Sequence, residues 1–213
     1  MGLGIMTAEL EANTSPDFVA TLSKAAAHER DKRSDRPSAK AVVNSLLQAE
    51  KVAKQQRLTY PLESLLGDWR LCFTAQSKAH LRGDVALGRG FYMPQIARAQ
   101  ISFGSRAPIA GENPGKAEIG NEIQFGLLLF KLTGPAQYLG KKNLLAFDFT
   151  HMKLMLFGRA VYSGGFRGGK ATATNFYSQP IAKLPFFAFF LVTDDFIAAR
   201  GRGGGLALWV KVT

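Results

Sequence analysis

The sequence predicts an all-β body, an antiparallel barrel or sandwich of roughly eight to ten short strands, preceded by a helical segment. Two observations predict this fold class. Residues 1–60 hold two of the 22 glycines and one of the 16 phenylalanines, so nearly all of both types lie in the rest of the 213-residue chain. Glycine marks turns, and phenylalanine favours the pleated surface of a sheet. After Pro61 the strand-like segments also follow one another without a helical pattern between them, which excludes a parallel α/β sheet.

Residues 1–37 form the predicted N-terminal extension, which contains a short helix and a charged linker. The Ser-Pro-Asp triplet at 15–17 is a typical helix start, because serine caps the first turn, proline fits the first helical position and aspartate opposes the helix dipole. This helix is expected to end near Glu29. Residues 30–37 mix basic and acidic side chains and end in proline, which favours a solvated linker over the alternative, a phosphate-binding patch.

Residues 38–213 form the predicted main domain, which begins with a helix and continues as the β body. Between residues 38 and 57 apolar side chains recur at helical spacing and leave lysines and a glutamine on the other side. Such an amphipathic helix is expected to pack one face on the body. The apolar positions are Val42, Val43, Leu46, Leu47, Ala49 and Ala53.

The first strand of the body alternates between two sets of side chains. Trp69, Leu71 and Phe73 share one face, which we expect to point inward, and Cys72 lies on the outer face under the helix. An up-and-down barrel of about eight strands can enclose one small ligand, so an interior binding site is expected. Further strand-like segments cover residues 95–103, 116–125, 127–133, 143–151, 153–157, 171–177, 186–193 and 206–212.

Three strand-like runs are apolar on both faces, at residues 127–130, 154–157 and 186–192. Each must bury one face inside the body and cover the other with a helix, a partner or a lipid surface. The helix at 38–57 is the favoured cover. One helix cannot cover all three runs, so membrane contact stays open as well.

The chain is basic, with 27 Lys and Arg against 16 Asp and Glu and a net charge of +11. Residues 1–60 account for only +2 of this charge, so the β body carries the basic surface. Its basic side chains flank glycine turns, whereas its aromatic side chains lie in runs too apolar to face water. This pattern favours an anionic membrane or an acidic protein over nucleic acid. The residues expected on this membrane or partner surface are Arg82, Arg89, Lys141, Lys142, Arg159, Arg167 and Lys170.

No group of residues predicts catalysis. Cys72 is the only cysteine, which excludes a disulfide framework and a thiolate-rich metal site. Residues 164–171 resemble a phosphate-binding loop, but alanine replaces the Ser or Thr that would bind Mg²⁺, which favours a basic turn. Asp148 and His151 fall on opposite faces of a strand, and the carboxylates at 194–195 follow a strand where a turn is due. We therefore expect no enzyme activity and no required cofactor or metal.

Two segments at the ends of the β body carry a further signal. Residues 65–74 have the sequence LLGDWRLCFT after a helix, and residues 193–201 have the sequence TDDFIAARG before a glycine turn and an apolar strand. They resemble the opening and closing segments of plastid lipid-associated proteins, also called fibrillins, of plastids and cyanobacteria. Gly67 and Trp69 are also similar to the lipocalin signature. The resemblance implies a lipocalin-like antiparallel β-barrel of roughly eight to ten strands, with the N-terminal helical segment packed on it.

In such a barrel, the resemblance implies that Trp69 closes the narrow end against Arg200, and that Asp195 pairs with Arg200. An indole ring would plug the barrel while its face stacks on a guanidinium group. The ligand would contact inward side chains, which are Trp69, Leu71, Phe73, Phe125, Phe147, Phe187 and Phe189.

The function that the resemblance implies is non-catalytic binding or carriage of an apolar isoprenoid lipid, such as a carotenoid or a quinone, at a photosynthetic membrane. The protein would support photoprotection or lipid traffic, at the cytoplasmic face of a thylakoid membrane or in a plastid stroma or plastoglobule. Two alternatives stay open. One is a scaffold or assembly factor for a photosynthetic or isoprenoid-biosynthetic complex, and the other is a bilin-lyase-like accessory that handles a pigment.

Membrane association is expected to be peripheral. The N-terminal residues lack the basic start and the apolar core of a signal peptide. The longest apolar run, residues 184–192, is far shorter than the roughly 20 residues of a membrane-spanning helix.

Overall fold

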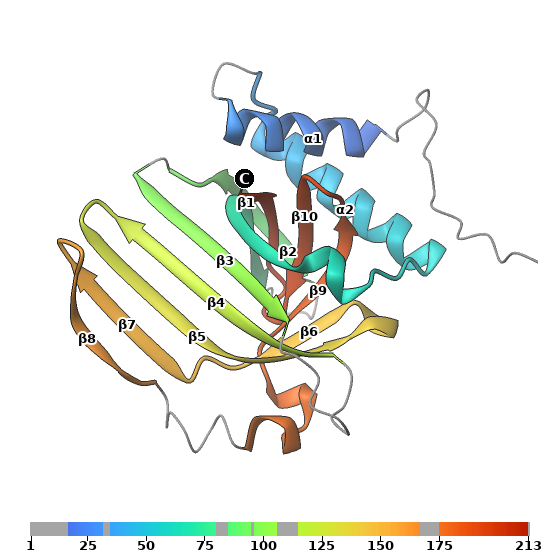
Figure 1. Cartoon of the computed structure of the whole chain (residues 1–213). Coiled ribbons are helices and arrows are strands. Elements are labelled where there is room, and N and C mark those ends of the chain that lie inside the picture. The colour runs from blue at the N-terminus through green and yellow to red at the C-terminus, as the bar shows by residue number, and fades with distance from the viewer. Residues whose placement is uncertain are drawn as a thin grey trace, which may run out of the picture.

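The computed structural model describes residues 17–31, 35–79, 85–94, 96–105, 115–166 and 175–212, with the backbone alone for 77–79 and 85–89. In these residues two helices, α1 (Asp17–Arg30) and α2 (Ala39–Gln56), precede eleven strands of one sheet (Figure 1). The strands are β1 (Gly67–Ala79), β2 (Val85–Tyr92), β3 (Ala97–Ser105), β4 (Lys116–Phe125), β5 (Leu128–Leu139), β6 (Leu144–Phe147), β7 (His151–Leu156), β8 (Arg159–Gly165), β9 (Phe186–Val192), β10 (Phe196–Gly201) and β11 (Leu206–Lys211).

Eight of these strands close into a barrel. Their order is β4-β3-β1-β11-β10-β9-β6-β5, and β5 pairs with β4 to complete the ring, with all pairs antiparallel. β2 pairs with β1, and β7 and β8 continue the sheet from β5. β7, β8 and the adjoining ends of β3, β4 and β5 therefore project beyond the barrel, and we call this part the projecting sheet (Figure 1). The predicted antiparallel barrel with an N-terminal helical segment is confirmed.

The two helices pack on the outside of the barrel and form a second core with it. Leu22 of α1 and Leu46 of α2 are fully buried in this core, which also contains apolar side chains of β1, β9, β10 and β11. Phe190 of β9 lies in the same core. The helix predicted at 38–57 thus covers one of the strands that are apolar on both faces.

A β-bulge in β1 changes which of its residues face the barrel interior. The register between β1 and β11 shifts between Leu71 and Phe73, which inserts one extra residue. Trp69 and Leu71 consequently pack in the barrel interior, whereas Phe73 packs under the helices, together with Cys72. The outward position of Cys72 is confirmed. The inward position of Phe73 is wrong, because strict alternation does not continue across the bulge.

Other boundaries also differ from the predicted ones. β2, β8 and β10 lie outside the predicted strands, because glycines occur in the first two and alanines in the third. β5 continues through Gly134 and Pro135, where we expected a break; a side chain at 134 would overlap the carbonyl oxygen of Asp148. The described end of the strand predicted at 171–177 is a 3₁₀ helix, Phe176–Ser178. The cap and first position predicted for the first helix, residues 15 and 16, lie outside the described residues.

Candidate lipid-binding face

The barrel interior is packed with large side chains. Trp69, Phe189 and Trp209 are buried there together with aliphatic residues of β3, β4 and β10. The ring centroids of Phe147 and Phe187 are 5.0 Å apart, and those of Phe187 and Trp209 are 5.4 Å apart. These rings therefore fill space that we expected a ligand to occupy. The predicted ligand contacts found in this interior are Trp69, Leu71, Phe147, Phe187 and Phe189.

Trp69 has a cationic partner, and that partner is Lys211 in place of Arg200. The ammonium nitrogen of Lys211 lies 4.6 Å from the centroid of the indole ring and donates a hydrogen bond of 3.2 Å to the Leu66 carbonyl. Trp69 itself donates from Nε1 to the Leu65 carbonyl at 2.7 Å. Lys211 occupies this position because it lies directly opposite Trp69 in the pairing of β1 with β11. The predicted stacking of Arg200 on Trp69 is wrong.

Arg200 and Asp195 each attach a helix to the barrel. Arg200 of β10 donates two hydrogen bonds to the Glu50 carboxylate on α2, at 2.8 and 2.6 Å, and a third to the Gly204 carbonyl. Asp195, in the turn before β10, makes an ion pair of 2.8 Å with Arg30 at the end of α1. The predicted pairing of Asp195 with Arg200 is therefore wrong. Residues 193–201 instead carry the side chains that hold α1 and α2, the helical layer, on the barrel.

The carboxylate of Glu50 is mostly buried, and its pKa reflects two opposing effects. Burial by itself would raise the pKa, but hydrogen bonds and positive charges from Arg200 and Lys54 outweigh it and hold the pKa below its ordinary value of 4.5. A carboxyl group with a lowered pKa in the folded protein stabilises the fold above pH 4.5. This stabilisation is lost as the pH falls through the folded-state pKa.

We expect Glu50→Gln to lower the free energy of unfolding by about 1–3 kcal/mol at neutral pH, because Arg200 loses its charged partner. As the pH falls through the folded-state pKa of Glu50, which lies below 4.5, the wild-type carboxylate becomes protonated, and the two proteins should approach the same stability. Urea unfolding of both proteins across this pH range measures the difference. A stability difference that stays constant from neutral to acidic pH would contradict the coupling.

The sheet that projects beyond the barrel carries an apolar face. Side chains two residues apart on a strand share a face, so this face is continuous with interior residues such as Ile119 of β4. Cross-strand pairing arranges its side chains in two neighbouring rows. The rows are Ile123, Phe130, Leu154 and Tyr162, and next to them Phe125, Leu128 and Leu156.

Much of this apolar face is exposed. Ile123, Leu128, Leu156 and Tyr162 are each 40 to 44% exposed, and Phe125 is 56% exposed. Phe125 lies here, and not inside the barrel as predicted, because β3, β4 and β5 continue together past the residues at which β3 pairs with β1 and β5 pairs with β6. The helices pack elsewhere, on β1, β2, β9 and β11. An exposed apolar face of this kind is typical of an interaction surface.

The opposite face of the projecting sheet is more polar. One cross-strand row there holds Glu122, Lys131 and Lys153, and the next row holds Gln124, Leu129 and Met155. Lys131 and Glu122 form an ion pair of 3.6 Å. The projecting sheet therefore has one mainly apolar face, on the same side as the barrel interior, and a mixed face opposite to it. The runs predicted to be apolar on both faces at 127–130 and 154–157 belong to this sheet, whereas the pattern around Ile123 and Tyr162 did not predict their place on the apolar face.

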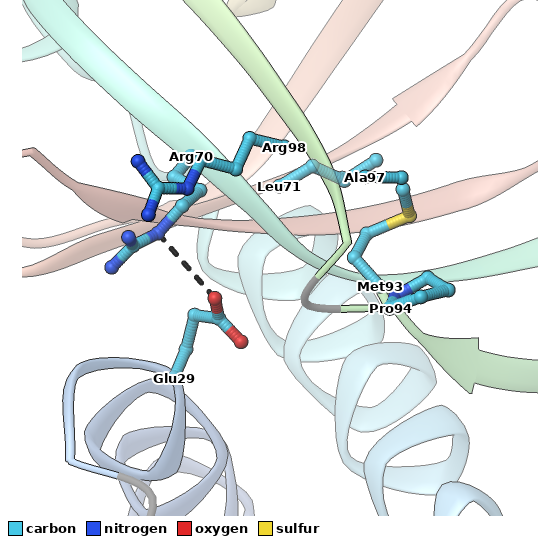
Figure 2. A pocket seen from close by; sticks show the side chains of 7 residues that line it. All are labelled: Glu29, Arg70, Leu71, Met93, Pro94, Ala97 and Arg98. Atoms are coloured by element: carbon cyan, nitrogen blue, oxygen red, sulfur yellow. Dashed lines mark ion pairs between the residues drawn. The ribbon is translucent and has the colours of Figure 1, made fainter. Parts of the chain in front are cut away.

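A small pocket on the outer surface holds two arginines and a glutamate. Figure 2 shows the guanidinium groups of Arg70 and Arg98 near one another, with Glu29 of α1 next to Arg70. Arg70 Nε and Glu29 Oε1 are 3.4 Å apart, an ion pair without the alignment of a hydrogen bond. The volume of the pocket is about 140 Å³, too small for a carotenoid or a quinone. Its ion pair serves to join α1 to β1.

A basic groove lies between the end of α2 and the turn before β6. Lys54, Arg57, Lys141 and Lys142 surround it, its floor comes from β9, and its volume is about 310 Å³. Lys141 and Lys142 of the predicted membrane or partner surface are thus exposed at this groove, whereas Arg159 is exposed at the start of β8. The remaining side chains predicted on that surface lie outside the described residues; they are Arg82, Arg89, Arg167 and Lys170.

The described residues provide no metal-binding group of three or more His, Cys, Asp or Glu side chains. His151 contacts Ser163, with 3.2 Å between Nε2 and Oγ. Most of the segment that resembles a phosphate-binding loop, residues 167–171, lies outside the described part of the chain. None of the described helices has the length and apolar character needed to cross a membrane.

No protein-family model matches the chain, and a comparison with curated proteins finds no significant match. The resemblance to fibrillins therefore stays a prediction.

Proposed function

We propose that this protein binds an apolar isoprenoid lipid, such as a carotenoid or a quinone, without catalysing a reaction. The observation that carries the proposal is the exposed apolar face of the projecting sheet, which continues from the barrel interior along β4 and β5. Soluble proteins rarely leave an extended apolar face in water, so this face needs an occupant.

The proposed ligand position differs from the expected interior site. Because aromatic rings of the chain occupy the interior, we assign the ligand to the open face, against side chains such as Phe130 and Leu154. A polyene or polyprenyl chain is long and apolar, and its burial there would contribute about 25 cal/mol per Å² before ordering costs. The helical layer leaves this part of the sheet open (Figure 1).

Two substitutions on neighbouring residues test the proposal. Phe130→Glu places a charge on the apolar face, and Leu129→Glu places the same charge on the opposite face of β5. Purified protein is mixed with β-carotene or plastoquinone, separated from free ligand by gel filtration, and measured by absorption. We expect the wild type and Leu129→Glu to retain the ligand. Phe130→Glu should retain at least about tenfold less ligand, because burying a charge against an apolar chain costs free energy.

Far-UV circular dichroism and the urea midpoint of both variants provide the folding control. Equal retention by Phe130→Glu and Leu129→Glu would exclude this face as the ligand site. Failure of the wild type to retain either lipid would remove the proposal.

The proposed setting is the surface of a photosynthetic membrane, where the protein would support photoprotection or lipid traffic. A net charge of +11 suits an anionic lipid surface. The fibrillin-like segments at 65–74 and 193–201 support a plastid or cyanobacterial setting.

A scaffold or assembly factor is the second candidate function, and the packed interior favours it, since a protein partner needs no cavity. The same apolar face would then bury side chains of a photosynthetic or isoprenoid-biosynthetic protein. The two functions give different results with the same variants. A scaffold would retain neither lipid, and it would form a stoichiometric complex with its purified partner that Phe130→Glu loses and Leu129→Glu keeps.

A further inference from the structure

Three turns lie side by side at one end of the projecting sheet (Figure 1). They precede β3, join β4 to β5, and join β7 to β8. Pairing aligns the strand ends in a single row, so the turns share one edge; the row is Ala97, Phe125, Leu128, Leu156 and Arg159. We call residues 96–98, 125–128 and 156–159 the turn edge. Adjacent strands are about 4.8 Å apart, so this edge is about 19 Å wide.

Each turn presents a large apolar side chain to solvent. Ile96 and Phe157 are both 70% exposed, and Leu127 is 62% exposed. Phe157 also has a φ of 51°, in the left-handed region where asparagine, aspartate and glycine are favoured and phenylalanine is rare. Because the ring is exposed, packing within the chain does not offset this strain. A strained and exposed aromatic residue at a turn indicates an interaction outside the folded chain.

The turn edge is also basic. Arg98 and Arg159 belong to it, and Lys131 and Lys153 follow on the adjoining strands. In the described residues 96–98, 122–131 and 153–162 the only acidic side chain is Glu122, which pairs with Lys131. Outside these ranges, Glu29 of α1 lines the same pocket as Arg98 and pairs there with Arg70. Exposed apolar side chains flanked by cations are typical of proteins that attach to an anionic lipid surface.

We propose that the turn edge docks on an anionic bilayer, with Ile96, Leu127 and Phe157 among the acyl chains and the arginines at the headgroups. A second copy of this chain is a poorer occupant, because it would bring the same cations together. The role of this docking rests on the proposed function, because docking would bring the apolar face to the membrane that supplies the lipid.

Flotation with vesicles tests the docking. Wild-type protein should float with phosphatidylcholine vesicles that contain about one quarter phosphatidylglycerol. Its partition into vesicles of phosphatidylcholine alone should be at least about tenfold weaker, because each basic residue near an anionic surface strengthens binding about fivefold. The double variant Leu127→Asn/Phe157→Asn should lose about tenfold or more in partition into the anionic vesicles. Asparagine suits a left-handed turn position, so Phe157→Asn should not weaken the hairpin.

A matched control and a direct readout of insertion complete the experiment. Leu47→Asn removes a leucine that is 39% exposed on α2, and it should float like the wild type. Phe157→Trp should shift its fluorescence to shorter wavelength on anionic vesicles, because an inserted indole leaves water. Equal flotation of the double variant and the wild type, absence of flotation of the wild type, or absence of the shift would each overturn the proposed docking surface.

Docking and lipid binding can fail separately. In the ligand-retention assay without vesicles, the double variant Leu127→Asn/Phe157→Asn should retain carotenoid or quinone like the wild type, because the apolar face is unchanged. Intact flotation without ligand retention would remove the proposed function alone. Intact retention without flotation would remove the docking surface alone.

Discussion

Replacing Arg200 with alanine is expected to lower the free energy of unfolding by about 2–4 kcal/mol. The substitution leaves the Glu50 side chain, which is 10% exposed, with Lys54 as its remaining ion-pair partner. It also removes the hydrogen bond to the Gly204 carbonyl. Because the Arg200 side chain is 25% exposed, water can reach Glu50 in the variant, and the loss should be smaller than for a fully buried pair.

Asp195→Ala is the matched control for this prediction. Asp195 also joins a helix to the barrel, but its side chain is 67% exposed and that of its partner Arg30 is 37% exposed. Exposed ion pairs contribute about 0–1 kcal/mol, so urea unfolding should separate the two variants. Equal small effects for both would show that the contact between Arg200 and Glu50 is not a principal link between α2 and the barrel.

Trp69→Ala is expected to cost about 3–5 kcal/mol of stability. The side chain is fully buried in the barrel and fills the space under Lys211, so truncation leaves a cavity. The hydrogen bond to the Leu65 carbonyl is lost as well. Trp69→Phe should cost less, because the phenyl ring fills most of the cavity. Urea unfolding followed by far-UV circular dichroism measures both variants without relying on the tryptophan that is removed.

Lys211→Met separates the cation from the packing at this site. Methionine keeps the apolar stem over the indole ring and removes the charge, which should cost about 0.5–2 kcal/mol. An effect within experimental error would show that the contact between Lys211 and Trp69 contributes nothing beyond burial. A cost for Trp69→Ala below that of Trp69→Phe would contradict the packed interior.

Several features of the fold could be predicted because they depend on local composition and periodicity. Glycines and phenylalanines concentrate after residue 60, which indicated short strands and turns. Helical spacing between 38 and 57 predicted a helix with one buried face, and α2 buries that face on the barrel. Runs at 127–130 and 154–157 that are apolar on both faces predicted a need for cover, and they form part of the exposed apolar face.

The errors arose where pairing between distant residues overrides local alternation. The bulge in β1 depends on its fit to β11 and turns Phe73 away from the interior. Lys211 reaches Trp69 through strand register, and Arg200 reaches Glu50 across 150 positions of sequence. A single sequence contains no signal for such contacts. β5 continues through Gly134 and Pro135 by pairing with β4, and position 134 requires glycine because the backbone of Asp148 approaches too closely for a side chain there.

The sequence by itself determined that this protein has a helical layer, a β body and more apolar strand surface than one helix can cover. Periodicity and composition reflect preferences of neighbouring residues, so they predict helices and strands without a structure. Only the tertiary structure decided that the barrel interior is filled, that the uncovered face lies on a sheet beyond it, and that three turns with exposed apolar side chains share one edge with two arginines. These properties depend on register and on the order of strands, which bring together residues that are far apart in the chain.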